Sequence, residues 1–141
     1  MKRLVLLSTV LLLLYSCTES GTRYKNPYLP NYGFSMNINL DLPLYSGLNS
    51  PINPIVVTEP GTGLTLILMK VSNTDFRAWD ASCPNQYPSS CSRMHINGVN
   101  AVCSCDDYEY SIFTGTGTQG EYPMKPYRVQ ILEPKLIRVY N

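Results

Sequence analysis

The stretch CPNQYPSSC, residues 83–91, and the stretch CSCDDYEY, residues 103–110, hold four of the five cysteines in this chain of 141 residues. Four cysteines in such short stretches allow three arrangements, namely a zinc site, an iron–sulfur cluster or two disulfides. A structural zinc site usually has cysteine pairs with about two to four residues between them. Here seven residues separate the first pair and one separates the second. The spacing therefore fits zinc poorly.

If the cysteines form disulfides, a bond between Cys103 and Cys105 is disfavoured. Residues two apart in a strand point the same way, with Cα atoms roughly 6.5–7 Å apart, at or beyond the reach of a disulfide. Cys83 and Cys91 are therefore each expected to bond to one of Cys103 and Cys105. Spacing alone does not choose between the two resulting pairings.

The N-terminus predicts export. Lys2 and Arg3 precede an apolar run over residues 4–14, which is the pattern of a secretory signal and is too short for a mature membrane span. The ending LYSC, residues 14–17, resembles the bacterial lipobox, which implies cleavage before Cys17 and diacylglycerol on its thiol. The alternative is a plain secretory signal with an incidental cysteine.

This pattern divides the chain into a lipoprotein signal peptide at 1–16, a flexible polar tether at 17–33 and a domain at 34–141. Lipid chains would hold the protein on a membrane, because each buried methylene contributes roughly 0.8 kcal/mol. The expected location is the bacterial cell envelope, at the periplasmic face or the outer-membrane surface. Thiols exported to that compartment tend to form disulfides.

The charge of the chain argues against nucleic acid as a partner. Removal of Lys2 and Arg3 with the signal peptide would change the formal net charge from +1 to −1, so no basic surface is expected. The single histidine, His95, is predicted to be a surface side chain near a turn, and one histidine makes a hydrolase triad improbable. We therefore expect no catalytic activity.

Alternating apolar and polar residues predict an all-β fold, a sandwich or small barrel. The composition agrees, because tyrosine and proline are plentiful and only 15% of residues are charged. The glycine-rich stretch at 114–120 lacks a phosphate-binding pattern and is expected to be a turn or loop. The most apolar segment, 64–71, is expected to be a buried strand, and the other expected strands lie at 34–40, 55–57, 76–79, 108–112, 127–131 and 136–140.

Three longer segments resemble the Rieske-type [2Fe–2S] domain family. They are FRAWDASCP (76–84), AVCSCDDYEYSIFTG (101–115) and YPMKPYRVQ (122–130), and the lead-in at 26–48 resembles that of lipoproteins from Bacteroidetes-like bacteria. The resemblance implies a Rieske-like fold with cysteine-bearing loops. It places Cys83 and Cys103 at the two cysteine-ligand positions, with Asn85 and Asp106 where the family has its histidine ligands.

These two replacements imply a degenerate family member. A Rieske centre binds one iron through two thiolates and the other through two neutral imidazoles. Asn85 offers only a weak amide ligand, and Asp106 offers a hard carboxylate that suits the role poorly. No metal or cofactor is therefore expected, and a [2Fe–2S] cluster held by unusual ligands is the alternative.

The resemblance also implies a disulfide pairing. Respiratory Rieske proteins carry an extra cysteine after each ligand motif, and these two cysteines bond to each other. Cys91 and Cys105 match those positions, which leaves Cys83 and Cys103 to form a second disulfide. A thiol–disulfide redox role for Cys83 and Cys103 is a third possibility, although no C-x-x-C motif is present.

The sequence thus predicts a lipid-anchored structural or binding module of the envelope, with an envelope protein as its unidentified partner. The alternative is an electron-transfer protein. Of the remaining residues, Asp106, Asp107 and Glu109 are expected to form a solvated acidic edge. Five aromatic residues are expected in the core and on strand surfaces rather than in a sugar-binding platform: Trp79, Tyr108, Tyr110, Tyr122 and Tyr127.

Overall fold

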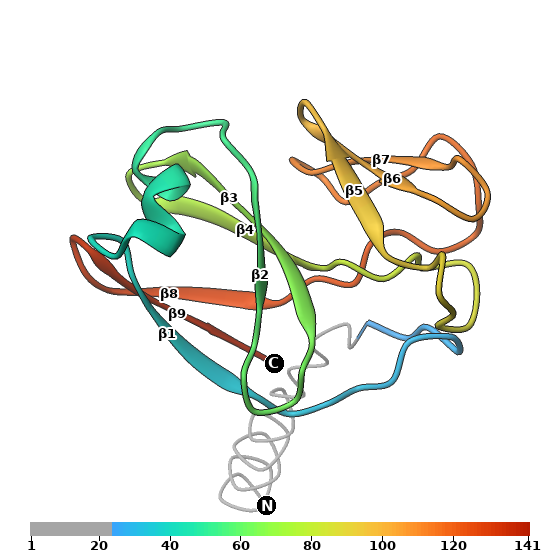
Figure 1. Cartoon of the computed structure of the whole chain (residues 1–141), viewed down its shortest axis with the longest axis horizontal. Coiled ribbons are helices and arrows are strands. Elements are labelled where there is room, and N and C mark those ends of the chain that lie inside the picture. The colour runs from blue at the N-terminus through green and yellow to red at the C-terminus, as the bar shows by residue number, and fades with distance from the viewer. Residues whose placement is uncertain (1–23) are drawn as a thin grey trace, which may run out of the picture.

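The computed structural model describes residues 24–141. These residues form nine β-strands, arranged in three antiparallel sheets (Figure 1). The expected signal peptide, the expected lipidation site Cys17 and the first residues of the expected tether lie outside the described residues. The all-β fold predicted from the sequence is confirmed. Among residues 24–141, no helix has the length and apolar character needed to cross a bilayer.

Each sheet has three strands. The first, in spatial order, contains β1 (Ser35–Asn39), β9 (Leu136–Tyr140) and β8 (Arg128–Glu133). The second contains β2 (Ile55–Thr58), β3 (Thr65–Ser72) and β4 (Asp75–Asp80). The third contains β5 (Met94–Asn97), β6 (Asn100–Cys103) and β7 (Glu109–Ser111). A short 3₁₀ helix, η2 (Pro43–Asn49), connects β1 to β2 and has a proline in its first turn.

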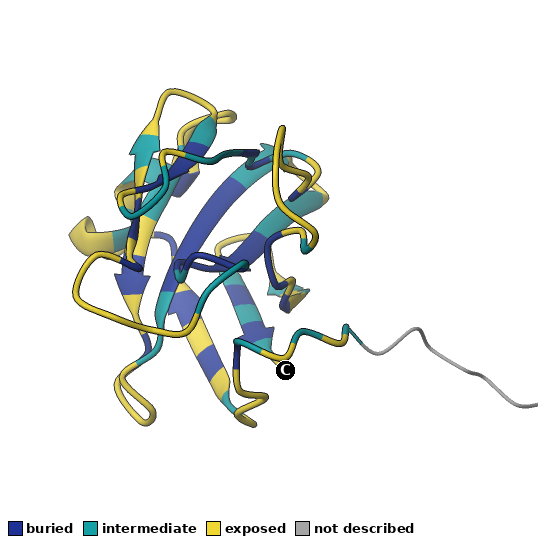
Figure 2. Ribbon diagram, turned by 90° about the vertical axis from the view of Figure 1, so that its right-hand side faces the viewer, coloured by how far each residue is buried: buried dark blue, intermediate teal, exposed yellow. Residues whose placement is uncertain are grey.

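The second sheet lies between two hydrophobic cores, which explains the sequence of β3. Leu66 and Leu68 point into one core, whereas Ile67 and Met69 point into the other. Successive side chains of a strand face opposite sides of the sheet, so a strand covered on both faces is apolar at every position. This is why the segment predicted as a buried strand shows a continuous apolar run. Other strands, such as β1, alternate between exposed and buried residues (Figure 2).

The first core belongs to what we call the base half, formed by the first sheet, η2 and one face of the second sheet. Its aromatic centre is an edge-to-face pair between Phe34 and Tyr127, with ring centroids 4.8 Å apart. The buried residues of this core are Met36, Ile38, Leu40, Leu48, Val57, Leu66, Leu68, Ala78, Tyr127, Ile137 and Val139.

The second core belongs to the cysteine half, formed by the third sheet, the loops around it and the other face of the second sheet. Trp79 anchors this core and donates a hydrogen bond from Nε1 to the Ile112 carbonyl at 2.8 Å. Gly115 has φ +74° and lies so close that an added Cβ would stand 2.5 Å from the indole ring. The buried residues are Ile67, Met69, Trp79, Ala81, Cys83, Met94, Ala101, Cys103, Tyr110, Ile112 and Met124.

Residues 24–33 lie against the domain, although the sequence predicts that they belong to a flexible tether. The Tyr24 hydroxyl donates to the Pro123 carbonyl at 2.7 Å, and Asn26 Nδ2 donates to the Pro84 carbonyl at 2.7 Å. Leu29 is buried. In Figure 1 this blue segment runs beside the yellow cysteine-bearing loop before it enters β1. Polarity without periodicity predicted a tether, but side-chain hydrogen bonds and one buried leucine are enough to dock the segment.

Candidate functional site

Two loops carry the cysteines, and main-chain hydrogen bonds position both of them. The first loop leaves β4 and returns at β5, where the Cys83 amide donates to the Ser92 carbonyl at 2.7 Å. The second begins at Cys103, the last residue of β6, whose amide donates to the Tyr108 carbonyl at 3.0 Å. Met94 and Cys103 form the last pair of the β5–β6 ladder. The two loops therefore lie next to each other at one end of these strands.

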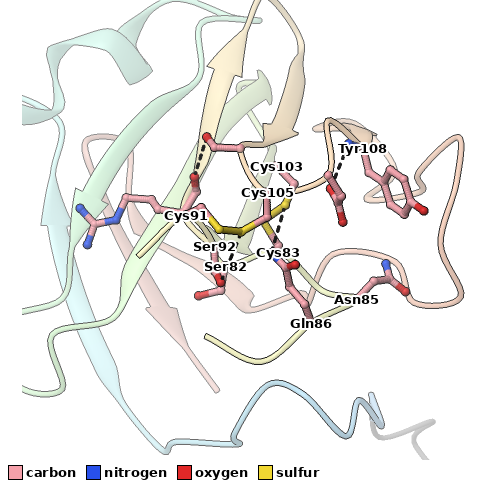
Figure 3. Close-up of a disulfide and its surroundings, with 12 residues drawn as sticks. Ser82, Cys83, Asn85, Gln86, Cys91, Ser92, Cys103, Cys105 and Tyr108 are labelled. Atoms are coloured by element: carbon pink, nitrogen blue, oxygen red, sulfur yellow. Dashed lines mark hydrogen bonds between the residues drawn. A yellow bond between two sulfur atoms is a disulfide. The ribbon is translucent and has the colours of Figure 1, made fainter. Parts of the chain in front are cut away.

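The two loops are joined by two disulfides, Cys83–Cys103 and Cys91–Cys105, with Cα atoms 5.5 Å and 5.1 Å apart (Figure 3). These are the pairs that the Rieske resemblance implies. The inner disulfide is enclosed by the cysteine core, because Cys83 and Cys103 are 1% and 0% exposed. The outer disulfide reaches the surface through Cys91, and the Ser89 hydroxyl lies 3.4 Å from the Cys91 sulfur.

Asn85, at one of the two replaced histidine positions, fastens its loop to the glycine-rich loop. Its Nδ2 donates to the Tyr110 hydroxyl and the Tyr122 carbonyl, each at 2.9 Å. Its Oδ1 accepts from the amides of Glu121 at 2.7 Å and Tyr122 at 2.9 Å. Gly120, with φ +87°, must lack a side chain, because a Cβ would stand 2.4 Å from Asn85 Nδ2. The amide group of Asn85 is therefore fully engaged as a structural clamp.

Asp106, at the other replaced histidine position, shapes its own loop. Its Oδ1 accepts a hydrogen bond from the Tyr108 amide at 3.0 Å, and the intervening Asp107 has the left-handed φ of 59°. This is a side-chain-stabilised turn of the kind that aspartate favours. Asp107 is exposed, while Asp106 and Glu109 are half-buried, so the expected acidic edge is only partly solvated.

His95 lies on β5 with an exposed side chain, and its Nδ1 is 3.3 Å from the hydroxyl oxygen of Ser104, the residue between Cys103 and Cys105. The turn expected beside it is present, since Gly98 between β5 and β6 has φ +61°. The predicted surface position of His95 is confirmed. Within residues 24–141, no three His, Cys, Asp or Glu side chains are grouped so that they could hold a metal ion.

In this arrangement the residues at the four ligand positions do not fit a [2Fe–2S] cluster. Cys83 and Cys103 are bonded to each other, so neither sulfur is a free thiolate, the form that binds metal. Asn85 bonds to Tyr110 and Tyr122, and Asp106 bonds to the Tyr108 amide in its own loop. Figure 3 shows the Asn85 side chain directed away from the sulfur atoms. The single imidazole of the chain, on His95, is exposed and contacts the Ser104 hydroxyl.

Several residues that shape this region were not singled out by sequence reasoning. Gln86 donates from Nε2 toward the Cys103 sulfur at 3.4 Å, and Tyr24 and Asn26 dock the N-terminal segment. No local pattern signals these contacts. Lys125 differs from these residues, because a sequence pattern does signal its burial. It is 2% exposed and lies two positions before Tyr127, which is also buried, so in an alternating segment both side chains face inward. The alternation at 127–131, extended backwards by two residues, would have placed this lysine inside.

Comparison with known proteins agrees with the architecture. No described protein family and no curated protein matches the sequence. Among solved structures, a chain in the complex of reduced oxygenase and oxidized ferredoxin in carbazole 1,9a-dioxygenase matches with a TM-score of 0.50. It is 16% identical, and the match covers 75% of this chain and 92% of that one. The putative NADH-dependent nitrite reductase small subunit from Mycobacterium tuberculosis matches with a TM-score of 0.49 and 13% identity, over 79% of this chain and 97% of that one.

The similarity to the chain in the carbazole 1,9a-dioxygenase complex is a similarity of fold. Together with the three small antiparallel sheets and the cysteine-bearing loops, it defines the chain as a small β domain of the Rieske-like fold. Residues 24–141 therefore contain a Rieske-like domain in which disulfides join the two loops.

Proposed function

We propose that this protein is a lipid-anchored module of the bacterial envelope whose Rieske-like domain holds no iron–sulfur cluster and acts in binding or structure rather than catalysis. The observation that carries the proposal is that residues at the cluster-ligand positions are already bonded within the protein. Cys83 and Cys103 are bonded to each other, and all the hydrogen-bonding capacity of the Asn85 side chain is used within the protein.

The chemistry of the compartment supports this proposal. Disulfides form and persist in exported proteins, and a small loop-rich domain gains stability from them. In the chain-entropy model, each cross-link here stabilises the fold by roughly 3 kcal/mol. These cross-links hold both loops against the third sheet. They could therefore take over the structural role of a bound cluster.

Iron analysis and thiol titration test the proposal together. The full chain, purified from cells grown with ample iron, should be colourless, contain no stoichiometric iron and show no thiol from residues 83–105 when denatured without reductant. Brown protein with about two irons per chain would overturn it. Free thiols in protein without iron would overturn the structural role of the disulfides.

The electron-transfer alternative draws on a specific observation, which is that Cys83 and Cys103 come together from the two loops with Cα atoms 5.5 Å apart. As thiolates they would be adjacent donors. The alternative requires both cysteines to be reduced and two further ligands to be released from their present hydrogen bonds. Anaerobic purification followed by visible absorption spectroscopy would reveal such a cluster.

The anchor is tested separately. The variant Cys17→Ser should accumulate as an unprocessed precursor that takes up no labelled palmitate, whereas the unaltered chain should be processed and labelled. Equal processing of both chains would indicate a plain secretory signal.

The proposed envelope partner can be sought in a separate experiment, by crosslinking in intact cells in which the domain remains attached to the membrane.

A further inference from the structure

Two adjoining hollows lie between the docked N-terminal segment and the start of β8. Their volumes are about 510 Å³ and 460 Å³, and Tyr24, Asn31 and Lys125 line both of them. Because the two hollows share these residues, we treat them as one groove and call it the Lys125 groove. It is separate from the four cysteines, none of which lines it.

The floor of the groove holds a buried cation with unused hydrogen-bond donors. Lys125 is 2% exposed, and its Nζ donates to the Pro30 carbonyl at 2.5 Å. An ammonium group has three donors, and among the described residues Nζ makes no other hydrogen bond. Its Nζ also lies 5.5 Å from the centre of the Tyr127 ring. A buried charge with so few partners is costly, and a ligand with acceptor oxygens would lower that cost.

Asp80, the acid whose charge acts on Lys125, forms no salt bridge with it. Asp80 is buried, and its two oxygens accept hydrogen bonds from the Ser82 amide and the Tyr127 hydroxyl, each at 2.8 Å. Within residues 24–141 no salt bridge to Lys125 is formed. Burial lowers the pKa of Lys125, while the charge of Asp80 raises it. Each oxygen of Asp80 thus accepts a hydrogen bond from another group, and neither accepts one from Lys125 Nζ.

The lining of the groove favours a negative ligand. Lys25 lines the first hollow and Arg128 lines the second, and neither hollow is lined by Asp or Glu among the described residues. Ligand sites combine a mostly apolar wall with a few convergent polar groups. Leu29 and Tyr122 supply such a wall in the first hollow, beside the buried ammonium.

We propose that the Lys125 groove binds a small organic carboxylate. The carboxylate accepts hydrogen bonds from Lys125 Nζ, and the apolar body of the ligand lies against Leu29 and Tyr122. This inference gives a ligand class to the binding role proposed above and rests on that role. It does not depend on the redox state of the cysteines, so iron analysis and ligand titration can fail independently.

Amide NMR of the full chain, titrated with benzoate, tests the proposal. A carboxylate of this size should bind with a dissociation constant on the order of 1 mM. The amides of residues 24–31 and 122–128 should shift saturably, and those of the third sheet should not. Benzamide has the same ring without the charge and should bind about 10- to 100-fold more weakly, because it loses the charged hydrogen bond. Equal shifts with benzamide, or no saturable shift with benzoate, would overturn the proposal.

Variants locate the interaction. Lys125→Met keeps most of the buried stem, removes the charge and should weaken benzoate binding about 10- to 100-fold. Lys135→Met, at an exposed lysine in the turn after β8, should bind as the unaltered chain does. Should Lys125→Met not fold, Lys125→Arg retains the charge and should retain binding, and the benzamide comparison still decides. Tighter binding of inorganic phosphate than of benzoate would show an anion site without the apolar contact and would contradict the ligand class.

Discussion

The base half and the cysteine half share the middle sheet, yet they are held together in different ways. The base half encloses its core between two sheets, and most of its buried core residues come from β1, η2, β2, β3, β4 and β9. The strands of the third sheet have only three or four residues each, and the cysteine half adds two disulfides and the Asn85 clamp. A half with short strands relies on cross-links to fix its loops, whereas longer paired strands do not need them.

The base half and the cysteine half also differ in the sequence variation that they can tolerate. In the base half, any well-packed apolar set of similar volume keeps the core. In the cysteine half, single atoms matter, since Asn85 bonds with all of its amide atoms and Gly120 leaves room for it.

Replacing all four cysteines of the two loops with serine should have the largest effect. Two cross-links worth roughly 3 kcal/mol each are lost, so unfolding of the cysteine half should become about 6 kcal/mol easier. Amide hydrogen exchange should show lost protection in β5, β6 and β7 and retained protection in β1, β8 and β9. Reduction of the unaltered chain should give the same pattern. Equal loss of protection in both halves would mean that they unfold as one unit.

Removing the clamp should have an intermediate effect. Asn85→Ala leaves two amides, one carbonyl and the Tyr110 hydroxyl without their partner, which should cost about 1–3 kcal/mol in the free energy of unfolding by denaturant. The matched control is Asn73→Ala in the exposed turn between β3 and β4, which should change stability by less than about 0.5 kcal/mol. A neutral Asn85→Ala would show that the glycine-rich loop is held by other contacts.

The two disulfides should differ in their rate of reduction. Cys91 is exposed, whereas Cys83 and Cys103 are enclosed by the cysteine core, so a thiol reagent reaches the outer bond first. Reduction of Cys91–Cys105 should be at least about tenfold faster, because the inner bond requires local opening. Mass spectrometry of quenched, alkylated samples would report the order. Simultaneous release of four thiols would indicate that the half opens cooperatively.

The smallest effect is expected from a charge in the base half. Glu59 accepts hydrogen bonds from the Thr62 hydroxyl and from the amides of Thr62 and Gly61, which lower its pKa below 4.5. The stability contributed by the ionised group is therefore fully present above its ordinary pKa and is lost as pH falls through the lowered value.

Glu59→Gln should accordingly flatten the acid limb of a plot of melting temperature against pH. Glu133→Gln, an exposed glutamate at the end of β8, serves as the control and should leave that limb unchanged. An identical acid limb for all three chains would show that the hydrogen bonds to Glu59 do not persist in solution.

The sequence was informative where the pattern was periodic. The alternation around residues 34–40 and 127–131 gave strands, and the continuous run at 64–71 gave a buried strand, because burial on one or both faces leaves a direct trace in composition. The Rieske resemblance implied the Rieske-like form of this all-β fold and both disulfide pairs.

The sequence was uninformative where single contacts decide the structure. Nothing in the order of residues shows that Asn85 bonds to a tyrosine 25 positions later, or that Asn26 reaches Pro84. Such contacts bring together residues distant in sequence and have no periodic signal. Docking of residues 24–33 therefore became visible only once the fold was known.

That docking limits how far the domain can stand from a bilayer. With Cys17 lipidated as proposed, seven peptide steps connect the anchor to Tyr24, and an extended chain covers at most about 25 Å over them. A free linker extending to residue 33 would allow about 60 Å. With this shorter linker, the Lys125 groove would lie close to the lipid headgroups, and a macromolecular partner for this face would have to lie in or beside the membrane.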